Sequence, residues 1–453
     1  MKTDFRRHRE SRKKLKAAIK RGTLGLLDIG SSKIACIILK FPNGNNRSKK
    51  SEHLQETKRV AYRVVGVATR KSRGIKTGQV EIADEVEKSI RSVIQQAQKM
   101  ASTTIDDVLI CFSGGSPTSN SVFEELTLQT TVIGRRDIGT LLSKYDFDFA
   151  ANDREILHAM PVNFMLDDRN GLIDPCGLTG QNLGLDINIV TIDQNVLDNI
   201  TQCFKRCQLG LAGAIFSPYA SAKSSLVEDE LKLGSACIDM GSGSTGISIF
   251  VNHQMIFGST VKFGGEHITS DIMQAFQISF EEAERIKTLY GGVVITNLDD
   301  SDLIELSLGK EEEIIRNFDR PFISRSELIS VIRPRLEEIL EEVNIQLELG
   351  GYEYLPSKRI VFTGGASQLP GLYELAIEYF GPRVRIGRPM RVQGLPLALH
   401  GSQFSALIGL AIEASYPQDE VWDFDIPLKA GPTEKINQAV YWVKDNWNMF
   451  KFF

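Results

Sequence analysis

Two stretches of the chain place an aspartate just before a turn of glycine and hydroxyl residues, an arrangement suited to binding phosphate. The first, LGLLDIGSSKIACIILK, covers residues 24–40, and the second, SACIDMGSGSTGISIF, covers residues 235–250. The residues that could act on an anion follow Asp28 and Asp239: Gly30, Ser31, Ser32 and Lys33 in the first turn, and Gly241, Gly243, Ser244 and Thr245 in the second. Glycine lets several backbone N–H groups converge on one anion, and the hydroxyls and the lysine add further donors.

A carboxylate and a phosphate repel each other because both are negatively charged, unless a cation lies between them. We therefore expect Asp28 and Asp239 to hold magnesium through water, because this ion keeps most of its hydration shell in proteins. A third turn, with Gly364, Gly365 and Ala366, follows the apolar run of RIVFTGGASQLPGLYELA. One such hairpin is more often an ordinary β-turn, but all three turns together predict a site for a magnesium nucleotide. No GxxxxGKS/T loop occurs, which disfavours the P-loop fold. Residues 241–246 spell GxGxxG, but an apolar strand pattern and not a helix pattern follows them, which disfavours the dinucleotide fold.

The elements that must carry these turns alternate between strand and helix patterns. Strand patterns include RVVGVATR and DVLICFSGG, and residues 81–100 have the apolar periodicity of an amphipathic helix. A less regular region at 114–181 is followed by a strand at DINIVTI, a helix around 194–208 and a strand at GAIFSP. From residue 235 the opening pattern of strand, aspartate, turn and strand returns. The class is therefore α/β, in a chain long enough for more than one domain.

Composition and charge indicate the cell compartment of the protein and the kinds of partner that it could bind. No run reaches the roughly 18 apolar residues of a membrane span, and the first residues lack the apolar core of a signal peptide, so we expect a cytoplasmic protein. The six cysteines are expected to be reduced, and a metal site at Cys203 and Cys207 is disfavoured because no histidine is near. Residues 1–22 are strongly basic, and we expect a solvated tail there, with an arm that touches anionic lipid as the alternative. Nucleic acid is a weaker alternative, because few aromatic residues are interleaved to stack on bases.

The C-terminal segment changes character. Residues 415–435 contain three prolines and many acidic residues, which predicts a flexible linker. Residues 436–453 follow an amphipathic helical pattern with aromatic residues that prefer a lipid interface. The apolar face carries the residues expected to enter a membrane surface: Ile436, Val440, Val443, Trp447 and Phe450. Such a helix is too polar to span a bilayer but suits its surface, with docking on the protein's own body as the alternative.

The three turns resemble the phosphate 1, phosphate 2 and adenosine motifs of the actin, sugar-kinase and heat-shock chaperone ATPases. Within this superfamily the chain resembles the FtsA family of bacterial actin-like division proteins over residues 24–414 and at its C-terminus. The pieces EILHAMP and DPCGLTG are specific to that family, and GIKTGQV, GGEHITSDI, EEAERIKTLYGG and TGGASQLPGL support the match. The resemblance implies an actin-like two-lobed ATPase fold with a duplicated β-sheet core and an inserted FtsA-type 1C subdomain.

The resemblance also implies how the chain divides. The expected parts are a basic tail (1–22), the first lobe 1A (23–113 and 182–230), the insert 1C (114–181), the second lobe 2A (231–272 and 336–414), the small subdomain 2B (273–335), the linker (415–435) and the membrane-targeting helix (436–453). In the family, the insert serves filament contacts and recruits later division proteins, and 2B contacts the tubulin-like protein FtsZ.

The ligand that the resemblance implies is ATP with Mg²⁺, held between the lobes. The two hairpin loops would hold the phosphates, and the third turn would pack against the adenosine. Glu284 and Lys287 would contact ribose and adenine, and Gly264 and Gly265 of GGEHITSDI belong to the same binding set. From the residues alone, Glu284 and Lys287 would be interpreted as a surface salt bridge on one helix.

Two departures from the family pattern bear on chemistry. Ser242 replaces a usual glycine, and Gly246 stands where many relatives have a polar residue, but the backbone donors remain. The chaperone-like members have a catalytic glutamate before a proline, and here FSPYASA has Ser217 in that place. We therefore expect at most slow ATP hydrolysis, with no catalytic residue assigned, since a general base contributes about 10²–10⁴-fold.

The function implied is an ATP-binding actin-like protein that assembles at the inner face of the cytoplasmic membrane, anchors the FtsZ ring and recruits later division proteins. The expected partners are FtsZ, other division proteins, further copies of the chain and anionic lipid, but not nucleic acid. Two alternatives stay open, a PilM-like actin-fold adaptor and a small-molecule kinase or hydrolase of the same superfamily. The insert and the tail argue against the first, and the missing carboxylate base and the tail argue against the second.

Overall fold

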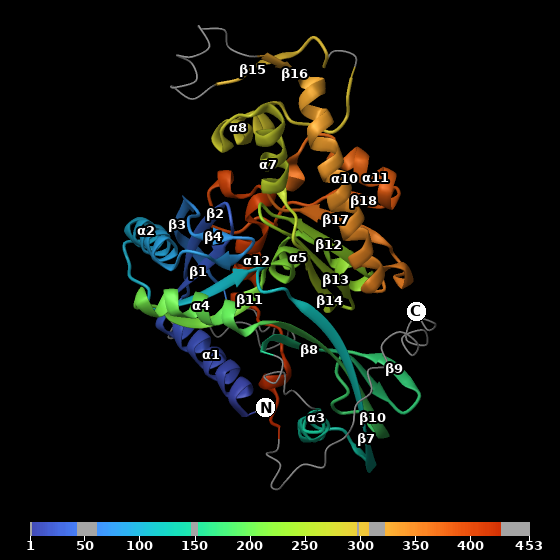
Figure 1. The fold of residues 1–453 in the computed structure, drawn as a ribbon. Coiled ribbons are helices and arrows are strands. Elements are labelled where there is room, and N and C mark those ends of the chain that lie inside the picture. The colour runs from blue at the N-terminus through green and yellow to red at the C-terminus, as the bar shows by residue number, and fades with distance from the viewer. Residues whose placement is uncertain (1, 43–60, 146–152, 297–298, 308–321, 427–453) are drawn as a thin grey trace.

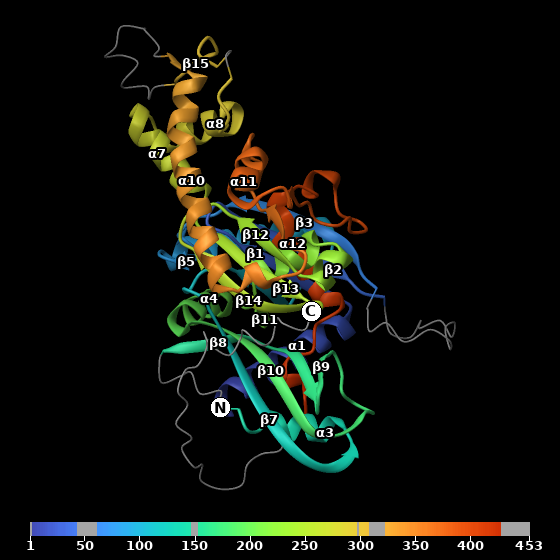
Figure 2. The same ribbon diagram turned by 90° about the vertical axis from the view of Figure 1, so that its right-hand side faces the viewer.

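The computed structural model describes residues 2–42, 61–145, 153–296, 299–307 and 322–426. These residues form two lobes, each built around its own β-sheet, and a third sheet that extends away from them (Figure 1). In the turned view the third sheet lies at one end of the molecule, and α7 (Gly265–Phe276), α8 (Phe280–Tyr290) and α10 (Arg325–Leu349) lie at the other (Figure 2). The predicted α/β fold with a duplicated core and an insert is confirmed.

The first lobe is built on a five-stranded sheet with the order β11-β6-β1-β2-β3. The strands span Thr23–Ile29 (β1), Lys33–Lys40 (β2), Arg63–Lys71 (β3), Asp107–Phe112 (β6) and Gly210–Phe216 (β11). β1 and β2 form an antiparallel hairpin whose turn is the first predicted phosphate loop, and β6 pairs with β1 in parallel. Both hairpin strands are almost continuously apolar and are buried on both faces, as is typical of strands inside a sheet that helices cover.

The second lobe repeats this plan with the strand order β14-β13-β12-β17-β18. The strands span Ser235–Met240 (β12), Thr245–Val251 (β13), Gln254–Val261 (β14), Arg359–Thr363 (β17) and Val384–Ile386 (β18). β12 and β13 form the second antiparallel hairpin, β14 pairs with β13, and β17 lies parallel to β12. The repeat in the sequence therefore corresponds to a duplicated sheet.

Helices cover the sheets and fill the space between the lobes. Their bounds are Ala83–Ala101 (α2), Gln194–Arg206 (α4), Ser217–Ser225 (α5), Glu228–Leu233 (α6), Leu372–Phe380 (α11) and Ser405–Ser415 (α12). α5 and α12 pack together at the centre of the molecule (Figure 1). A Cβ atom at Gly409 of α12 would lie 1.7 Å from the carbonyl oxygen of Ala220 in α5, so this close approach requires glycine. α2 and α4 match the helices predicted at 81–100 and 194–208, because their apolar periodicity is local.

The insert differs from its expected description. Its strands, in the order β7-β10-β8-β9, span Thr118–Val132 (β7), Arg154–Leu166 (β8), Arg169–Leu172 (β9) and Thr179–Asp193 (β10), and α3 spans Arg135–Leu142. The region at 114–181 that was expected to be less regular is thus largely a regular sheet. The strand predicted at 186–192 is the end of β10, so the boundary expected between residues 181 and 182 falls inside one strand. Polar residues crowd both faces of β7 and the start of β10, which weakens the alternation that identifies a strand.

Residues 1–22 do not form the expected solvated tail. The segment Lys2–Arg21 is a helix, α1, that packs against β11 and β1 with Leu15 buried. Arg12 lies within 3.4 Å of the Glu420 carboxylate. The helix has few apolar residues. It docks because its polar side chains also contact residues far away in the sequence, such as Glu420.

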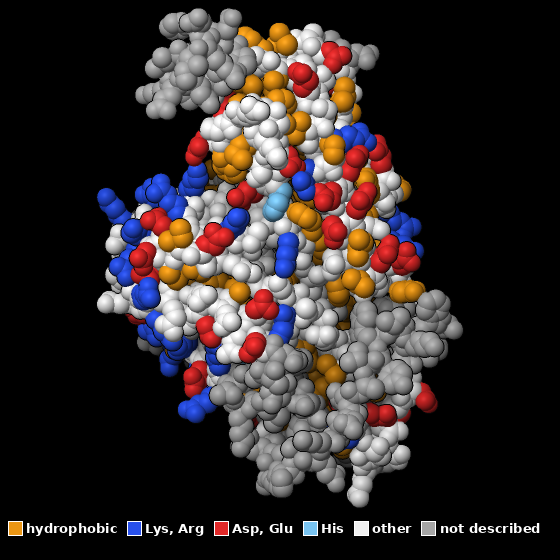
Figure 3. Space-filling view, in the orientation of Figure 1, with side chains coloured by type: hydrophobic (Ala, Val, Ile, Leu, Met, Phe, Trp, Pro, Cys, Tyr) orange, Lys and Arg blue, Asp and Glu red, His pale blue; other side chains and the backbone are white. Residues whose placement is uncertain are grey.

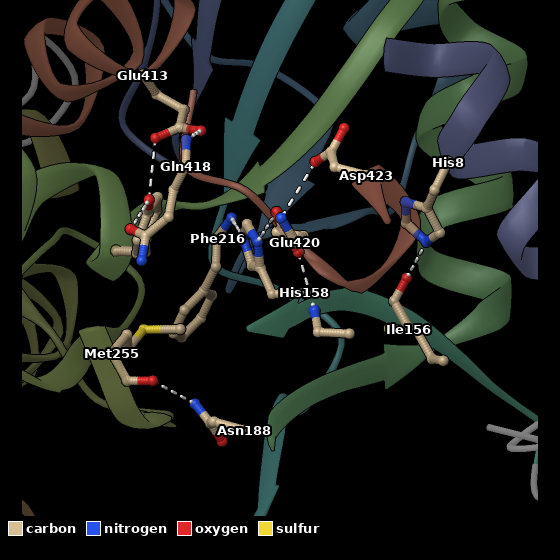
Figure 4. A network of polar contacts seen from close by, with 12 residues as sticks. His8, Ile156, His158, Asn188, Phe216, Met255, Glu413, Gln418, Glu420 and Asp423 are labelled. Carbon is tan, nitrogen blue, oxygen red and sulfur yellow. Dashed lines mark hydrogen bonds and ion pairs between the residues drawn. The ribbon is translucent and has the colours of Figure 1, made fainter. Parts of the chain in front are cut away.

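The first half of the predicted linker is also ordered against the body. Residues 416–426, which we call the C-terminal strap, include the 3₁₀ helix η7 (Val421–Asp423) and bury Val421 and Trp422 in the core of the insert. Figure 4 shows Glu420 of the strap beside His158 of β8, with 3.2 Å between Glu420 Oε1 and His158 Nδ1. The expectation of a flexible linker is therefore wrong for the strap. The residues at 427–453, with the predicted membrane helix, lie outside the described residues.

The outer end of the second lobe carries α8 and the short strands β15 (Leu303–Glu305) and β16 (Phe322–Ser324). α10 begins at a capping box, in which the Ser324 hydroxyl accepts from the Glu327 N–H (3.2 Å) and the Glu327 carboxylate accepts from the Ser324 N–H (2.7 Å). The helix continues through the boundary expected between residues 335 and 336, so 2B and 2A share it.

Short elements complete the description: β4 (Ile75–Lys76), β5 (Gln79–Val80), η3 (Tyr352–Tyr354), η4 (Ala366–Gln368), η5 (Leu397–Leu399) and η6 (Ser402–Phe404). Cys36, Cys111 and Cys237 are buried in β2, β6 and β12, as their apolar surroundings predict. Among the described residues, no helix is long and apolar enough to cross a membrane.

Candidate functional site

A cleft of about 600 Å³ is lined by all three predicted turns, from both lobes. This volume is in the range of sites for small molecules and cofactors. The predicted residues on its lining are Asp28, Gly30, Ser31, Ser32, Lys33, Asp239, Gly241, Gly243, Ser244, Gly265, Glu284, Lys287, Gly364, Gly365 and Ala366. Parts of the chain that are far apart in the sequence are thus brought to one cavity.

The two hairpin loops have the same local geometry and face each other. The Gly30 N–H donates to the Lys33 carbonyl and the Gly241 N–H to the Ser244 carbonyl, each at 3.0 Å. A Cβ atom at Gly243 would lie 2.5 Å from Ser31 Oγ, so the absence of a side chain there lets the second loop approach the first. The loops therefore leave room for an anion but not for larger side chains of their own.

Asp28 and Asp239 lie at the ends of β1 and β12, and both have raised pKa values. Burial raises the pKa of the Asp28 carboxyl, against the opposing effect of the Lys33 charge. Burial also raises the pKa of Asp239 to about 6, and the charge of Asp28 reinforces this, whereas a hydrogen bond from the Ser221 hydroxyl (2.5 Å) opposes it. Two half-buried carboxylates that resist ionisation are suited to a shared cation.

This donor set fits a hydrated magnesium ion. Among the described residues, no three or more His, Cys, Asp or Glu side chains form a cage for a metal. An ion held by Asp28 and Asp239 would therefore complete its coordination with water and phosphate oxygens, as Mg²⁺ commonly does.

Lys33 makes contacts that its sequence position did not predict. Its ammonium donates to the Gln403 carbonyl and lies 4.0 Å from the ring centroid of Phe404, while burial lowers its pKa. Both partners belong to η6, which precedes α12. Lys33 thus joins the first loop to the segment that enters the central helix pair.

The third turn packs against the second hairpin. Gly364 has a φ of +89°, and a Cβ atom there would lie 2.4 Å from Asp239 Oδ1 and 2.5 Å from the Met240 carbonyl oxygen. Only glycine combines this backbone conformation with so close a contact. The turn therefore directs η4 and Ala366 toward the cleft.

Glu284 and Lys287 of α8 form the ion pair expected from their spacing, and both also line the cleft. Lys287 Nζ donates to Glu284 Oε2 (2.6 Å), to Thr269 Oγ1 (2.7 Å) and to the carbonyl oxygen of Gly265 (2.9 Å). The Lys287 side chain is only 14% exposed. The pair therefore joins α8 to α7 at the mouth of the cleft, beyond what a surface salt bridge would do.

Two predicted residues lie behind the second loop and not on the cleft. Thr245 is fully buried and donates from its hydroxyl to the Phe263 carbonyl (2.8 Å). A Cβ atom at Gly264 would lie 2.5 Å from the Ser242 carbonyl oxygen, so this glycine lets the chain pass beneath the loop. Both residues support the loop and do not line the cavity.

Several lining residues were missed from the sequence. Ser113 follows β6, and its hydroxyl lies 3.1 Å from that of Ser244 across the cleft. Ser402, Gln403 and Ser405 come from the segment around η6, where no glycine or charge pattern indicated a site. The GIKTGQV motif could have indicated a support for the first loop, since the Gly78 N–H donates to Ser31 Oγ (3.1 Å).

Comparison with solved structures shows the fold. The chain is similar to a protein of the PilM–PilN type IV pilus biogenesis complex, with a TM-score of 0.58 and 15% identity, covering 87% of this chain and 99% of that one. It is also similar to MreB 5 of Spiroplasma citri bound to AMPPNP, with a TM-score of 0.50 and 12% identity, covering 86% and 96%. The arrangement of the two lobes is therefore actin-like.

Comparison with known sequences shows the family. The family model for the cell division protein FtsA matches residues 236–409, and that for the SHS2 domain inserted in FtsA matches residues 114–191. The cell division protein FtsA of Agrobacterium fabrum (strain C58) is 34% identical over 434 residues, covering 94% of this chain and 95% of the relative. FtsA of Escherichia coli (strain K12) is 27% identical, covering 87% and 91%. The chain, which contains the three-turn cleft and the inserted sheet, therefore belongs to the FtsA family of cell division proteins.

Proposed function

We propose that the cleft binds ATP with Mg²⁺. The observation that carries the proposal is the meeting of the three turns, in which Asp-led hairpins from opposite lobes face each other across one cavity. The loop N–H groups and Lys33 would bind the phosphates, Asp28 and Asp239 would hold the hydrated ion, and Glu284, Lys287 and the third turn would surround the nucleoside. The ion would supply charge that offsets the phosphates beside the two carboxylates. A fold neighbour solved with AMPPNP, an ATP analogue, supports the choice of nucleotide.

We further propose that ATP acts mainly as a conformational switch and is hydrolysed slowly. The carboxylates that line the described part of the cleft are Asp28, Asp239 and Glu284. The first two face the proposed ion site, and the third is paired with Lys287. Ser217 occupies the position of the catalytic glutamate of the chaperone-like members of the superfamily and cannot remove a proton from water as a carboxylate does. Because the loops come from both lobes, bound nucleotide would favour one relative position of the lobes.

The proposed setting is the inner face of the cytoplasmic membrane at the division site. The amphipathic sequence of residues 436–453 would lie in the lipid surface, and self-assembly would multiply its modest affinity. The FtsA family supports FtsZ as the partner that is anchored there. The insert would recruit later division proteins, and copies of the chain would assemble into filaments.

Vesicle flotation of the purified protein tests the membrane and nucleotide proposals together. The intact chain is compared with a chain that ends at Lys435, each with and without magnesium ATP, on vesicles that contain anionic lipid. We expect only the intact chain to float, and more of it with ATP. If both chains stay in solution under every condition, membrane attachment is wrong. If flotation ignores ATP, the proposed switch is wrong.

A further inference from the structure

α1 presents an outward face of lysines on a firmly held helix. Lys13, Lys16 and Lys20 are spaced three and four residues apart, so they lie on one side of the helix, and all three are exposed. Among the described residues, no carboxylate forms an ion pair with any of them, although other basic residues of α1 do have such partners. We call these three residues the lysine face. Figure 3 shows Lys and Arg side chains, with some Asp and Glu side chains among them, along the left-hand flank of the molecule, and α1 lies at the lower end of this flank in Figure 1.

The opposite side of α1 fixes the direction in which the lysine face points. Leu15 and Ala18 are buried against the first lobe. Arg12 is largely buried and lies within 3.4 Å of the carboxylates of both Glu420 and Asp423. The helix cannot rotate about its axis without breaking these contacts, so the unpaired charges belong to a rigid surface.

The C-terminal strap leaves the body beside this helix. Arg9 donates to the carbonyl oxygens of Trp422 (3.2 Å) and Phe424 (2.9 Å). The His8 ring is stacked on Trp422 with 3.9 Å between the ring centroids. Figure 4 shows His8 and the strap residue Asp423 on neighbouring elements. These contacts with α1 therefore fix the position from which the chain leaves the folded body toward its C-terminal amphipathic segment.

The distances involved allow α1 and the tail to reach one membrane surface. The strap ends at Ile426 and the amphipathic segment begins at Ile436, and ten residues of extended chain reach at most about 35 Å. The 20 residues of α1 span about 30 Å. The amphipathic segment itself has Lys444 and Lys451 against Asp445, a net charge of only +1. It therefore has little means of its own to select anionic lipid.

We infer that the lysine face of α1 is a second membrane contact that binds anionic lipid headgroups while the C-terminal segment inserts. This inference rests on the proposed membrane attachment and specifies the lipid that it requires. One amphipathic helix gives reversible binding, and a cluster of basic residues beside it adds electrostatic affinity. Two contacts also orient the body, because a single tether would leave it free to rotate over the surface.

The test measures binding of the full chain to two kinds of vesicle. The variant is Lys13→Gln, Lys16→Gln and Lys20→Gln together, since glutamine keeps helix propensity and removes the charge. The matched control changes three other exposed lysines that have no ion pair among the described residues: Lys99, Lys232 and Lys262, each to glutamine. Vesicles contain either phosphatidylcholine alone or phosphatidylcholine with phosphatidylglycerol.

We expect the lysine-face variant to lose roughly 100-fold in its partition coefficient on the anionic vesicles, since each lysine near such a surface contributes about fivefold. Its binding to pure phosphatidylcholine should match that of the unaltered chain, and the control variant should bind both vesicles normally. Affinity of the unaltered chain for anionic vesicles should also fall steeply with salt, a readout that needs no variant.

Equal binding of the variant and the unaltered chain to anionic vesicles would overturn the inference, as would salt-independent binding. In that case membrane attachment by the tail still stands if the unaltered chain binds phosphatidylcholine. If the variant keeps its lipid affinity but loses an acidic protein partner, the face serves a protein and the inference is wrong. Failure of the unaltered chain to bind any vesicle would instead refute the proposed membrane function itself.

Discussion

At the scale of single residues, substitution of Gly364 tests why the third turn requires glycine. The reason is either its positive φ or the lack of space for a side chain. Both Gly364 and Gly381 have positive φ, but a Cβ atom at Gly364 would collide with Asp239 and Met240, whereas one at Gly381 meets nothing within 4 Å. We expect Gly381→Ala to lower the free energy of unfolding by about 1–2 kcal/mol through backbone strain alone. Gly364→Ala should cost about 1–3 kcal/mol more. Urea denaturation followed by circular dichroism measures both.

The same pair of variants separates stability from ligand binding. Gly364→Ala should weaken nucleotide binding, measured by titration calorimetry at a temperature where the variant is folded, because it displaces Asp239. Gly381→Ala should leave the affinity unchanged. Equal costs for the two variants would show that the contact with Asp239 can relax, contrary to our account.

His8 makes the docking of α1 sensitive to pH. Burial lowers the pKa of His8 from 6.5 to about 4, and its Nε2 lies 2.9 Å from the Ile156 carbonyl oxygen. Because the unfolded state binds the proton more readily, stability is fully present above pH 6.5 and is lost as the pH falls toward 4. Between pH 7 and pH 5 we expect protection of α1 against hydrogen exchange to fall by up to about 2 kcal/mol, after correction for the intrinsic rate.

The variant His8→Phe provides the control for this pH effect. Phenylalanine can keep the stacking on Trp422 but cannot take up a proton. The exchange protection of α1 should then no longer depend on pH in this range. A pH effect that persists in the variant would assign it to another group.

At the scale of elements, the C-terminal strap and α1 hold each other through Glu420. This carboxylate is 3% exposed, accepts from the Ala159 N–H (2.9 Å) and pairs with Arg12 and His158. Although burial opposes it, these partners keep the pKa of Glu420 below its usual value. We expect Glu420→Gln to destabilise α1 and the strap by about 3 kcal/mol, because it leaves the buried Arg12 with less compensating charge.

The exposed pair between Arg6 and Glu10 on the same helix provides the comparison. Its side chains are 81% and 58% exposed, so Glu10→Gln should change stability by less than about 0.5 kcal/mol. Hydrogen exchange of residues 5–21 and 416–426 measures both variants locally. If Glu420→Gln leaves these segments as protected as before, the strap is held by its apolar residues alone.

At the scale of the whole molecule, the cleft couples the two lobes, because each contributes one hairpin loop. Magnesium ATP at 100 times its dissociation constant should stabilise the folded protein by about 2.7 kcal/mol. For a chain of this size, that corresponds to a rise in Tm of about 3 °C. Differential scanning fluorimetry measures the rise, and EDTA should remove the part that depends on the metal.

The double variant Asp28→Asn and Asp239→Asn is the control for this shift. Both changes keep the shape of the side chains and remove the charges that would hold the ion. The variant should melt at the same temperature with or without magnesium. A normal, magnesium-dependent rise in this variant would place the ion elsewhere.

The sequence by itself determined the elements whose signal is local. The sequence predicted the helices α2 and α4 from their apolar periodicity, and it predicted the two hairpins with their glycine turns and the repeat between them. These predictions were possible because a helix face or a β-turn depends on neighbours within a few residues. The loop residues that line the cleft followed from the same turns, whereas the family resemblance supplied Gly265, Glu284, Lys287 and the insert. Thr245 and Gly264 were assigned to the cleft only because they sit next to residues that line it.

Only the tertiary structure decided the parts whose partners are remote. α1 lacks a broad apolar face and was expected to be a tail, yet it docks because Arg12 meets Glu420 of a strap that was itself expected to be a linker. Ser113 and Gln403 reach the cleft because β6 and η6 end beside it. Contacts between segments hundreds of residues apart leave no periodic trace in either segment, since each is stabilised by a surface that exists only after folding.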